Sequence, residues 1–201
     1  MIIPIAGLLA LLSPVLAGGR LTRYAEVRLR HGWIVVGALV AQILILEVVA
    51  ESQRGVLSAV HVATYAAAGV WVWLNRRVPG LWIVAVGAAT NGVTIALNDG
   101  TLPASARAVA GAGLELDPNS FVNSGVLADA RLPWLGDIFW IPEGWPLANV
   151  FSIGDALIVV GIAWGAHRIC GSRLVPARWA WTPAESAATP VGLTVSEQPA
   201  A

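Results

Sequence analysis

The sequence predicts an all-α membrane protein, a polytopic transmembrane helix bundle of about five spans with its N-terminus outside and its C-terminus in the cytoplasm. Three observations predict this class: the composition, five long apolar stretches, and an uneven distribution of Arg among the linkers. Of the 201 residues, 57% are hydrophobic and only 12% are charged, and the mean hydropathy is +0.71. This leaves too little polar surface to cover a water-soluble domain. We therefore expect a multi-pass protein of the cell (plasma) membrane.

The five apolar stretches are each close to the roughly 17–25 helical residues that cross a bilayer core. With an outer loop at 98–147, they predict one membrane domain over residues 1–170. A cytoplasmic tail follows at 171–201, and its composition, rich in Ala, Thr, Ser, Pro and Glu, predicts disorder from about residue 183. The predicted spans are 2–17, 33–50, 56–74, 81–97 and 148–166.

The first stretch ends in a small-residue run, Val15 to Gly19, and could instead be a cleaved signal peptide. Such a signal carries basic residues before its apolar run. Here none precedes the run and four Arg follow it directly, which would hold the following chain in the cytoplasm. We expect an uncleaved first span.

The orientation follows from charge. All twelve basic residues are Arg. Nine of them flank the predicted inner ends of the spans, and three lie on the other side. Short loops rich in Arg and Lys mark the cytoplasm. The outer loop is acidic, with six Asp or Glu against two Arg. Its part at 132–147 carries three Pro, which prevent a spanning helix, so it is expected to lie along the outer interface or fold back over the bundle.

Local signals mark the ends of two spans. Gly100 and Pro103 fit the C-terminal stop of the helix over 81–97, and a short helix is expected at 104–113. Ser152 and Asp155 have the spacing of a capping box for the last span. A recessed start of this helix would instead place Asp155 in a cavity roofed by the Pro-rich segment. The sequence leaves capping and site as alternatives for both residues.

Polar groups inside apolar spans are the usual indicators of function in membrane proteins. His61 and Tyr65, one helical turn apart, share a face and could simply bond a neighbouring helix. Asn91 requires a partner, because a buried carboxamide is costly when it is unpaired. All these groups are predicted to lie toward the outer end of the bundle. The candidate cavity is formed by Glu47, His61, Tyr65, Asn91, Asn98, Asp99, Ser152 and Asp155.

Other functions lack support in the sequence. It contains no phosphate-binding Gly-Lys-Ser/Thr motif, no His-Glu-x-x-His, no Gly-x-Ser-x-Gly and no Cys-x-x-Cys. The single Cys170 excludes an intramolecular disulfide. We expect no cofactor, no metal and no catalytic residue. Nucleic acid is not an expected partner either, because the Arg residues flank the spans and would attract lipid headgroups.

Three motifs resemble a known family. They are Gly18-Gly19-Arg20, the step from Asn98 to Ser105, and Leu135-Gly136-Asp137 followed by the run from Val150 to Asp155. Together they resemble an uncharacterised bacterial multi-pass membrane family, a domain of unknown function common in actinobacteria and other Gram-positive bacteria. The chain has Asn98-Asp99-Gly100-Thr-Leu-Pro at this step. The resemblance leads us to expect a sequence closer to Asn-Gly-Gly-x-Met-Pro there. The resemblance covers about residues 1–170, implies an integral protein of the bacterial inner membrane and implies no activity.

The functional expectation is an integral membrane protein without enzymatic activity that binds a partner helix, a lipid or a small molecule at an outward-facing polar cavity. Membrane lipid is the expected partner, together with another membrane protein. The alternatives are a small-molecule transporter, which needs a polar path through the bundle, and a membrane enzyme acting on a lipid. The enzyme would use Asp155, Asp99 and His61 as acid and base groups.

Overall fold

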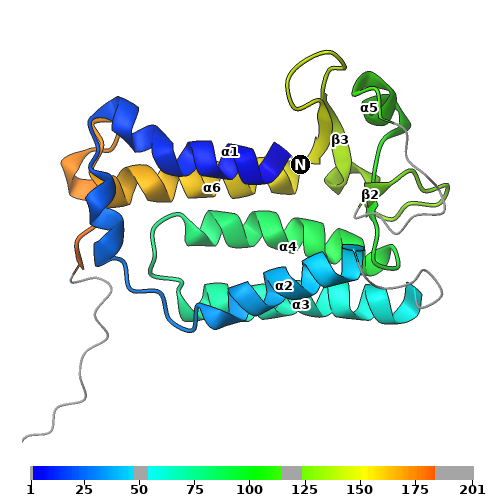
Figure 1. Ribbon diagram of the computed structural model, residues 1–201, viewed down its shortest axis with the longest axis horizontal. Helices are drawn as coiled ribbons and strands as arrows, with labels where there is room; N and C mark the ends of the chain where they lie inside the picture. Colours follow the sequence, from blue (N-terminus) through cyan, green and yellow to red (C-terminus); the bar gives the residue numbers. More distant parts are fainter. Residues whose placement is uncertain (1, 48–53, 115–123, 184–201) are drawn as a thin grey trace, which may run out of the picture.

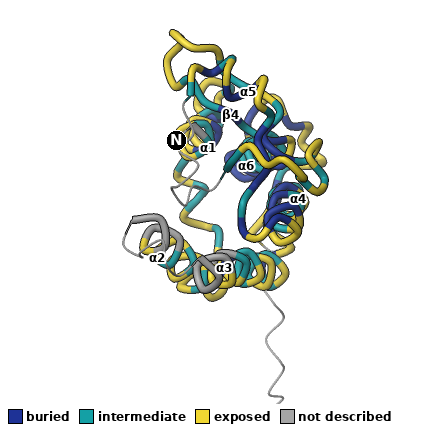
Figure 2. Tube along the Cα trace, turned by 90° about the vertical axis from the view of Figure 1, so that its right-hand side faces the viewer, coloured by how far each residue is buried: buried dark blue, intermediate teal, exposed yellow. Residues whose placement is uncertain are grey.

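The computed structural model describes residues 2–47, 54–114 and 124–183. Five helices lie roughly side by side and occupy the five apolar stretches (Figure 1). Their neighbours run in the order α2, α3, α4, α6, α1, and in Figure 2 the pair α2 and α3 stands apart from α1 and α6. The bounds are α1 (Ile2–Leu12), α2 (Trp33–Glu47), α3 (Arg54–Leu74), α4 (Leu81–Leu97) and α6 (Ile153–Cys170).

The prediction of an all-α bundle with about five transmembrane spans is wrong. The described residues include four strands, and one helix among them, α6, is long and apolar enough to cross a membrane. The other apolar helical stretches found among the described residues, Ile3–Ala17, Val62–Leu74 and Leu81–Leu97, are shorter. Apolar composition favours a helix but does not fix its uninterrupted length. The first stretch changes at Ser13 into the 3-10 helix η1 (Ser13–Ala17), with Pro14 in its first turn. The predicted tail disorder concerns residues 184–201, outside the described part of the chain.

Strands replace the irregular segments expected around the fourth and fifth stretches. A parallel pair joins β1 (Leu102–Pro103) and β2 (Ser124–Gly125). An antiparallel hairpin joins β3 (Asp137–Ile141) and β4 (Asn149–Ser152), so residues 149–152, predicted as helix, are extended. Pro142 and Pro146 lie in the turn of the hairpin, where they remove no ladder hydrogen bond. Phe139 and Phe151 stack across it with ring centroids 5.5 Å apart.

A small apolar core holds the hairpin to the short helix α5 (Ala106–Gly111) at one end of the bundle (Figure 1). The helix expected at 104–113 is therefore present. Trp140 covers this core from β3, and Val150 contributes from β4. The buried core residues are Ala104, Ala108, Val109, Ala112 and Val150.

Glycines bring α4 and α6 into close backbone contact. A Cβ atom at Gly161 of α6 would lie 2.7 Å from the backbone nitrogen of Val84 in α4. A Cβ at Gly154 would collide with the side chain of Asn91. Small residues at a helix interface let two backbones approach closely. The helices that carry Asn91 and Asp155 are thereby held together.

Candidate functional site

The N-terminus of α6 is closed by the capping box that the sequence predicts. Ser152 is the N-cap, and its hydroxyl oxygen accepts a hydrogen bond from the backbone N–H of Asp155 at 3.0 Å. The Asp155 carboxylate in turn accepts from the backbone N–H of Ser152 at 3.0 Å. Two of the free N–H groups at the start of the helix are thereby satisfied. The predicted capping role of both residues is confirmed.

Asn91 of α4 joins this cap from the neighbouring helix. Its Nδ2 donates to Asp155 Oδ1 at 2.9 Å, and the Ser152 hydroxyl donates to Asn91 Oδ1 at 2.8 Å. Asn91 and Ser152 are buried. Gly154 makes this geometry possible, because any larger residue would occupy the place of the Asn91 amide. The partner that Asn91 required is therefore the cap of α6.

Asp137 is the residue of this region that sequence reasoning missed as a site residue. It lies in β3 directly opposite Ser152, as its register partner in the hairpin. Its side chain is only 4% exposed. One carboxylate oxygen accepts a hydrogen bond from the Ser124 hydroxyl at 2.5 Å, but the other, Oδ1, is buried with no hydrogen-bond partner. A buried carboxylate oxygen without a donor is rare in proteins, because such an atom normally binds a water, an ion or another polar group.

Electrostatics set Asp137 apart from an ordinary carboxylate. Burial raises the pKa of Asp137 to about 6, the hydrogen bond from Ser124 lowers it, and the nearby charge of Asp155 raises it further. Burial disfavours the charged form, and a second carboxylate does the same. Asp137 can therefore hold a proton up to about pH 6, and above this pH it favours a cationic donor as its partner.

The other predicted site residues are placed differently. Tyr65 of α3 packs against Gly92 of α4 and is close enough to Asp155 and Asp137 to interact electrostatically with both. Asn98 is buried and holds the backbone of Arg131, donating to its carbonyl at 2.8 Å and accepting from its N–H at 2.7 Å. It therefore anchors the loop before β3. Asp99 is exposed, in the turn after α4.

The side chains of the two remaining predicted residues, Glu47 and His61, lie outside the part of the chain that is described. In the described residues, no group of three or more His, Cys, Asp or Glu side chains could hold a metal ion.

We name the polar group at this end of the bundle the carboxylate cluster. It consists of Asp137, Asp155, Asn91, Ser152, Ser124 and Tyr65.

Residues 26–166 match a family of unknown function, DUF5317. The chain belongs to this family. The expectation of an uncharacterised domain family is confirmed, whereas the bacterial membrane nature of DUF5317 and its spread among actinobacteria stay predictions. All residues of the carboxylate cluster lie within the matched DUF5317 region.

An uncharacterized protein of Thermotoga maritima is 29% identical to this DUF5317 chain over 92 residues, which cover 46% of the chain and 52% of the relative. The chain thus spans about half the length of the curated relative it matches. No solved structure matches this DUF5317 chain.

Proposed function

We propose that this DUF5317 protein is a membrane-embedded binding protein without enzymatic activity, and that its ligand presents a hydrogen-bond donor, best a cationic one, to Asp137 in the carboxylate cluster. The observation that carries the proposal is the buried Oδ1 of Asp137, which has no partner. A ligand N–H or O–H would satisfy this atom.

Charge favours a cation among possible donors. Asp155 lies near Asp137, and its charge disfavours ionisation of Asp137. Both oxygens of Asp155 are already engaged, one by Asn91 and one by Ser152. The free acceptor is therefore on Asp137, and an ammonium group placed there would form a charge-assisted hydrogen bond. Asp155, Asn91 and Ser152 would hold the adjacent helix end in place.

The surface of the helices supports a location in lipid. Large apolar side chains on α1, α2, α3, α4 and α6 are exposed, and large exposed apolar patches mark interaction or membrane surfaces. Leu9 of α1 is 62% exposed, Leu39 of α2 is 60% exposed and Val160 of α6 is 55% exposed. Exposed positions run along the outer sides of α2 and α3 in Figure 2. Acyl chains would cover these faces at no cost in apolar hydration.

The test is identification of a bound molecule. The full chain, extracted in a mild detergent, is analysed by native mass spectrometry. We expect a co-purifying species that the Asp137→Asn variant loses and the Asp129→Asn variant keeps. Asp129 is a suitable control because it is an exposed acid of the same loop. Retention of the same species by Asp137→Asn would contradict the proposed site, as would parent protein that carries no bound species.

The same preparation separates the alternative functions. A transporter would exchange the bound species across a vesicle membrane, and an enzyme acting on a lipid would convert it on incubation. A binding protein releases it unchanged on dilution.

A further inference from the structure

We infer that the end of the bundle opposite the carboxylate cluster is a docking surface for the phosphate headgroups of anionic phospholipids. This inference rests on the proposed membrane location and adds the chemical class of the lipid. We name this region the basic end. It consists of residues 18–32, 75–80 and 167–183, and it carries nine Arg and a single acidic residue, Glu26.

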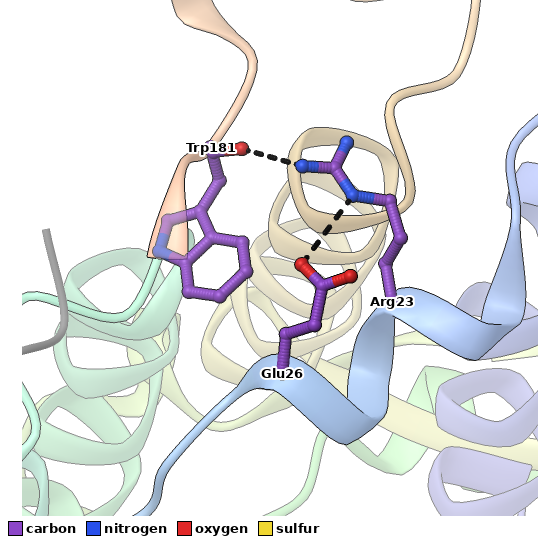
Figure 3. Close-up of polar contacts among 3 residues, drawn as sticks. All are labelled: Arg23, Glu26 and Trp181. Atoms are coloured by element: carbon purple, nitrogen blue, oxygen red, sulfur yellow. Dashed lines mark hydrogen bonds and ion pairs between the residues drawn. The ribbon is translucent and has the colours of Figure 1, made fainter. Parts of the chain in front are cut away.

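The three segments of the basic end are far apart in sequence but are tied into one surface, at the left of Figure 1. The buried side chain of Asn75 accepts from the backbone N–H of Arg30 at 2.7 Å and donates to its carbonyl at 3.0 Å. The backbone N–H of Arg20 donates to the carbonyl of Cys170 at 2.9 Å. Arg23 reaches the carbonyl of Trp181 at 2.8 Å (Figure 3). The three segments that carry the Arg residues are therefore held together.

Most of the positive charge at this end is available to a ligand. Figure 3 shows the ion pair of Arg23 with Glu26, which has an N–O distance of 3.9 Å. Glu26 is the one acid of the basic end, so it can neutralise a single Arg at most. Seven further Arg side chains are exposed, namely Arg20, Arg28, Arg30, Arg76, Arg77, Arg173 and Arg178. Guanidinium groups bind phosphate oxygens through paired N–H donors.

Indole rings beside the Arg residues favour a lipid surface over other phosphate-bearing partners. Trp33 is 72% exposed and Trp73 is 67% exposed at the ends of α2 and α3. The guanidinium of Arg76 lies 4.5 Å from the ring of Trp73, and that of Arg178 lies 5.0 Å from the ring of Trp179. Amphipathic indoles prefer the headgroup level of a bilayer. The exposed apolar faces of the helices begin next to these Trp and Arg residues. A bilayer presents acyl chains beside its headgroups and would cover such faces, whereas a nucleic acid would not.

The experiment is flotation of the full chain with vesicles, after dilution from mild detergent. One set of vesicles contains phosphatidylcholine alone, and the other contains a minor fraction of phosphatidylglycerol. We expect recovery with both sets, and an apparent affinity for the anionic set at least about 25-fold higher, from about five-fold for each of two Arg near an anionic surface. The Arg28→Gln/Arg77→Gln variant should lower this excess by about 25-fold. The Arg107→Gln/Arg131→Gln variant, with the same net charge but changed at the other end, should keep it.

Each result is decisive. Equal recovery with the two vesicle sets would overturn the inference and leave the membrane proposal intact. Equal loss of the excess in both double variants would also overturn the inference, because it would show a net-charge effect without a docking surface. No recovery with either set would overturn the membrane proposal itself. Displacement from anionic vesicles by an RNA oligonucleotide at equal phosphate concentration would assign the basic end to nucleic acid instead.

Discussion

Replacing Asp137 by Asn should make the protein more stable at alkaline pH, which is the reverse of the usual effect of changing a buried polar residue. The pKa of Asp137 is raised from 3.8 to about 6 in the folded protein. The folded state therefore holds this proton over a pH range in which the unfolded chain has released it. Ionisation of Asp137 therefore leaves the free energy of unfolding unchanged below about pH 4. It lowers this free energy as the pH rises from about 4 to about 6, and the full loss is present above about pH 6.

The size of the effect follows from the same shift. About two pKa units at 1.36 kcal/mol each correspond to about 3 kcal/mol of destabilisation at pH 8. Asn cannot ionise, so the variant escapes this destabilisation. The hydrogen bond from Ser124, which favours the charged form, is already contained in this net shift. We expect the free energy of unfolding of Asp137→Asn to exceed that of the parent by about 3 kcal/mol at pH 8, and the difference to vanish near pH 4.

The assay is unfolding of the ligand-free protein in detergent, followed by the fluorescence of its ten Trp residues between pH 4 and 8. Asp129→Asn is the control, because the Asp129 side chain is exposed, and it should track the parent at every pH. The reasoning is refuted if Asp137→Asn shows the same pH dependence as the parent, or if it is less stable at pH 8.

Three further changes test the contact between α4 and α6. Asp155→Asn should cost on the order of 1 kcal/mol or less of unfolding free energy, because the Asn side-chain oxygen can still accept from the Ser152 N–H and only the charge at the helix N-terminus is lost. Unchanged thermal stability with loss of the bound species would instead make Asp155 a ligand contact. Ser152→Ala should cost about 1–2 kcal/mol in chemical unfolding, since both the cap and the donor to Asn91 disappear; a neutral result would contradict the network. Gly161→Ala should lower the melting temperature, because the added methyl group overpacks the contact at a cost of about 1–3 kcal/mol. Gly69→Ala in α3 should raise the melting temperature slightly, because Gly69 has open space around it and Ala favours a helix. Equal shifts in these two glycine variants would argue against close packing at Gly161.

Helix positions were predictable from the sequence wherever an end signal accompanied an apolar run. The helix predicted at 81–97 is α4 with the same bounds, because Asn98 and Gly100 end it and Gly100 N–H bonds the carbonyl of Ile95 at 2.9 Å. The start of α6 was set by Ser152 and Asp155, whose capping box depends on local spacing alone. The last span predicted from apolar composition alone begins earlier, at residue 148, and so includes the residues of β4.

The hairpin and Asp137 could not be predicted, because their contacts are non-local. Pro and Trp between 132 and 147 hide the alternation that identifies strands, and the register of Asp137 with Ser152 depends on how the turn folds. In the sequence, Asp137 is one charge of an acidic loop and the last residue of the Leu135-Gly136-Asp137 motif. Neither feature indicates that its side chain is buried. The placement of Asn91 against Asp155 likewise depends on the packing of two helices, 64 residues apart in sequence.

The junction between β4 and α6 has a consequence for how related chains can vary in length. Ser152 ends the strand and Ile153 begins the helix, so no linker residue separates them. An insertion or deletion at this point would separate Ser152 from the first turn of α6 or rotate the helix relative to the hairpin, and would break the capping box. Length differences among family members should therefore collect in the hairpin turn at 142–148, where added residues project away from the helices, and should be absent between 149 and 155.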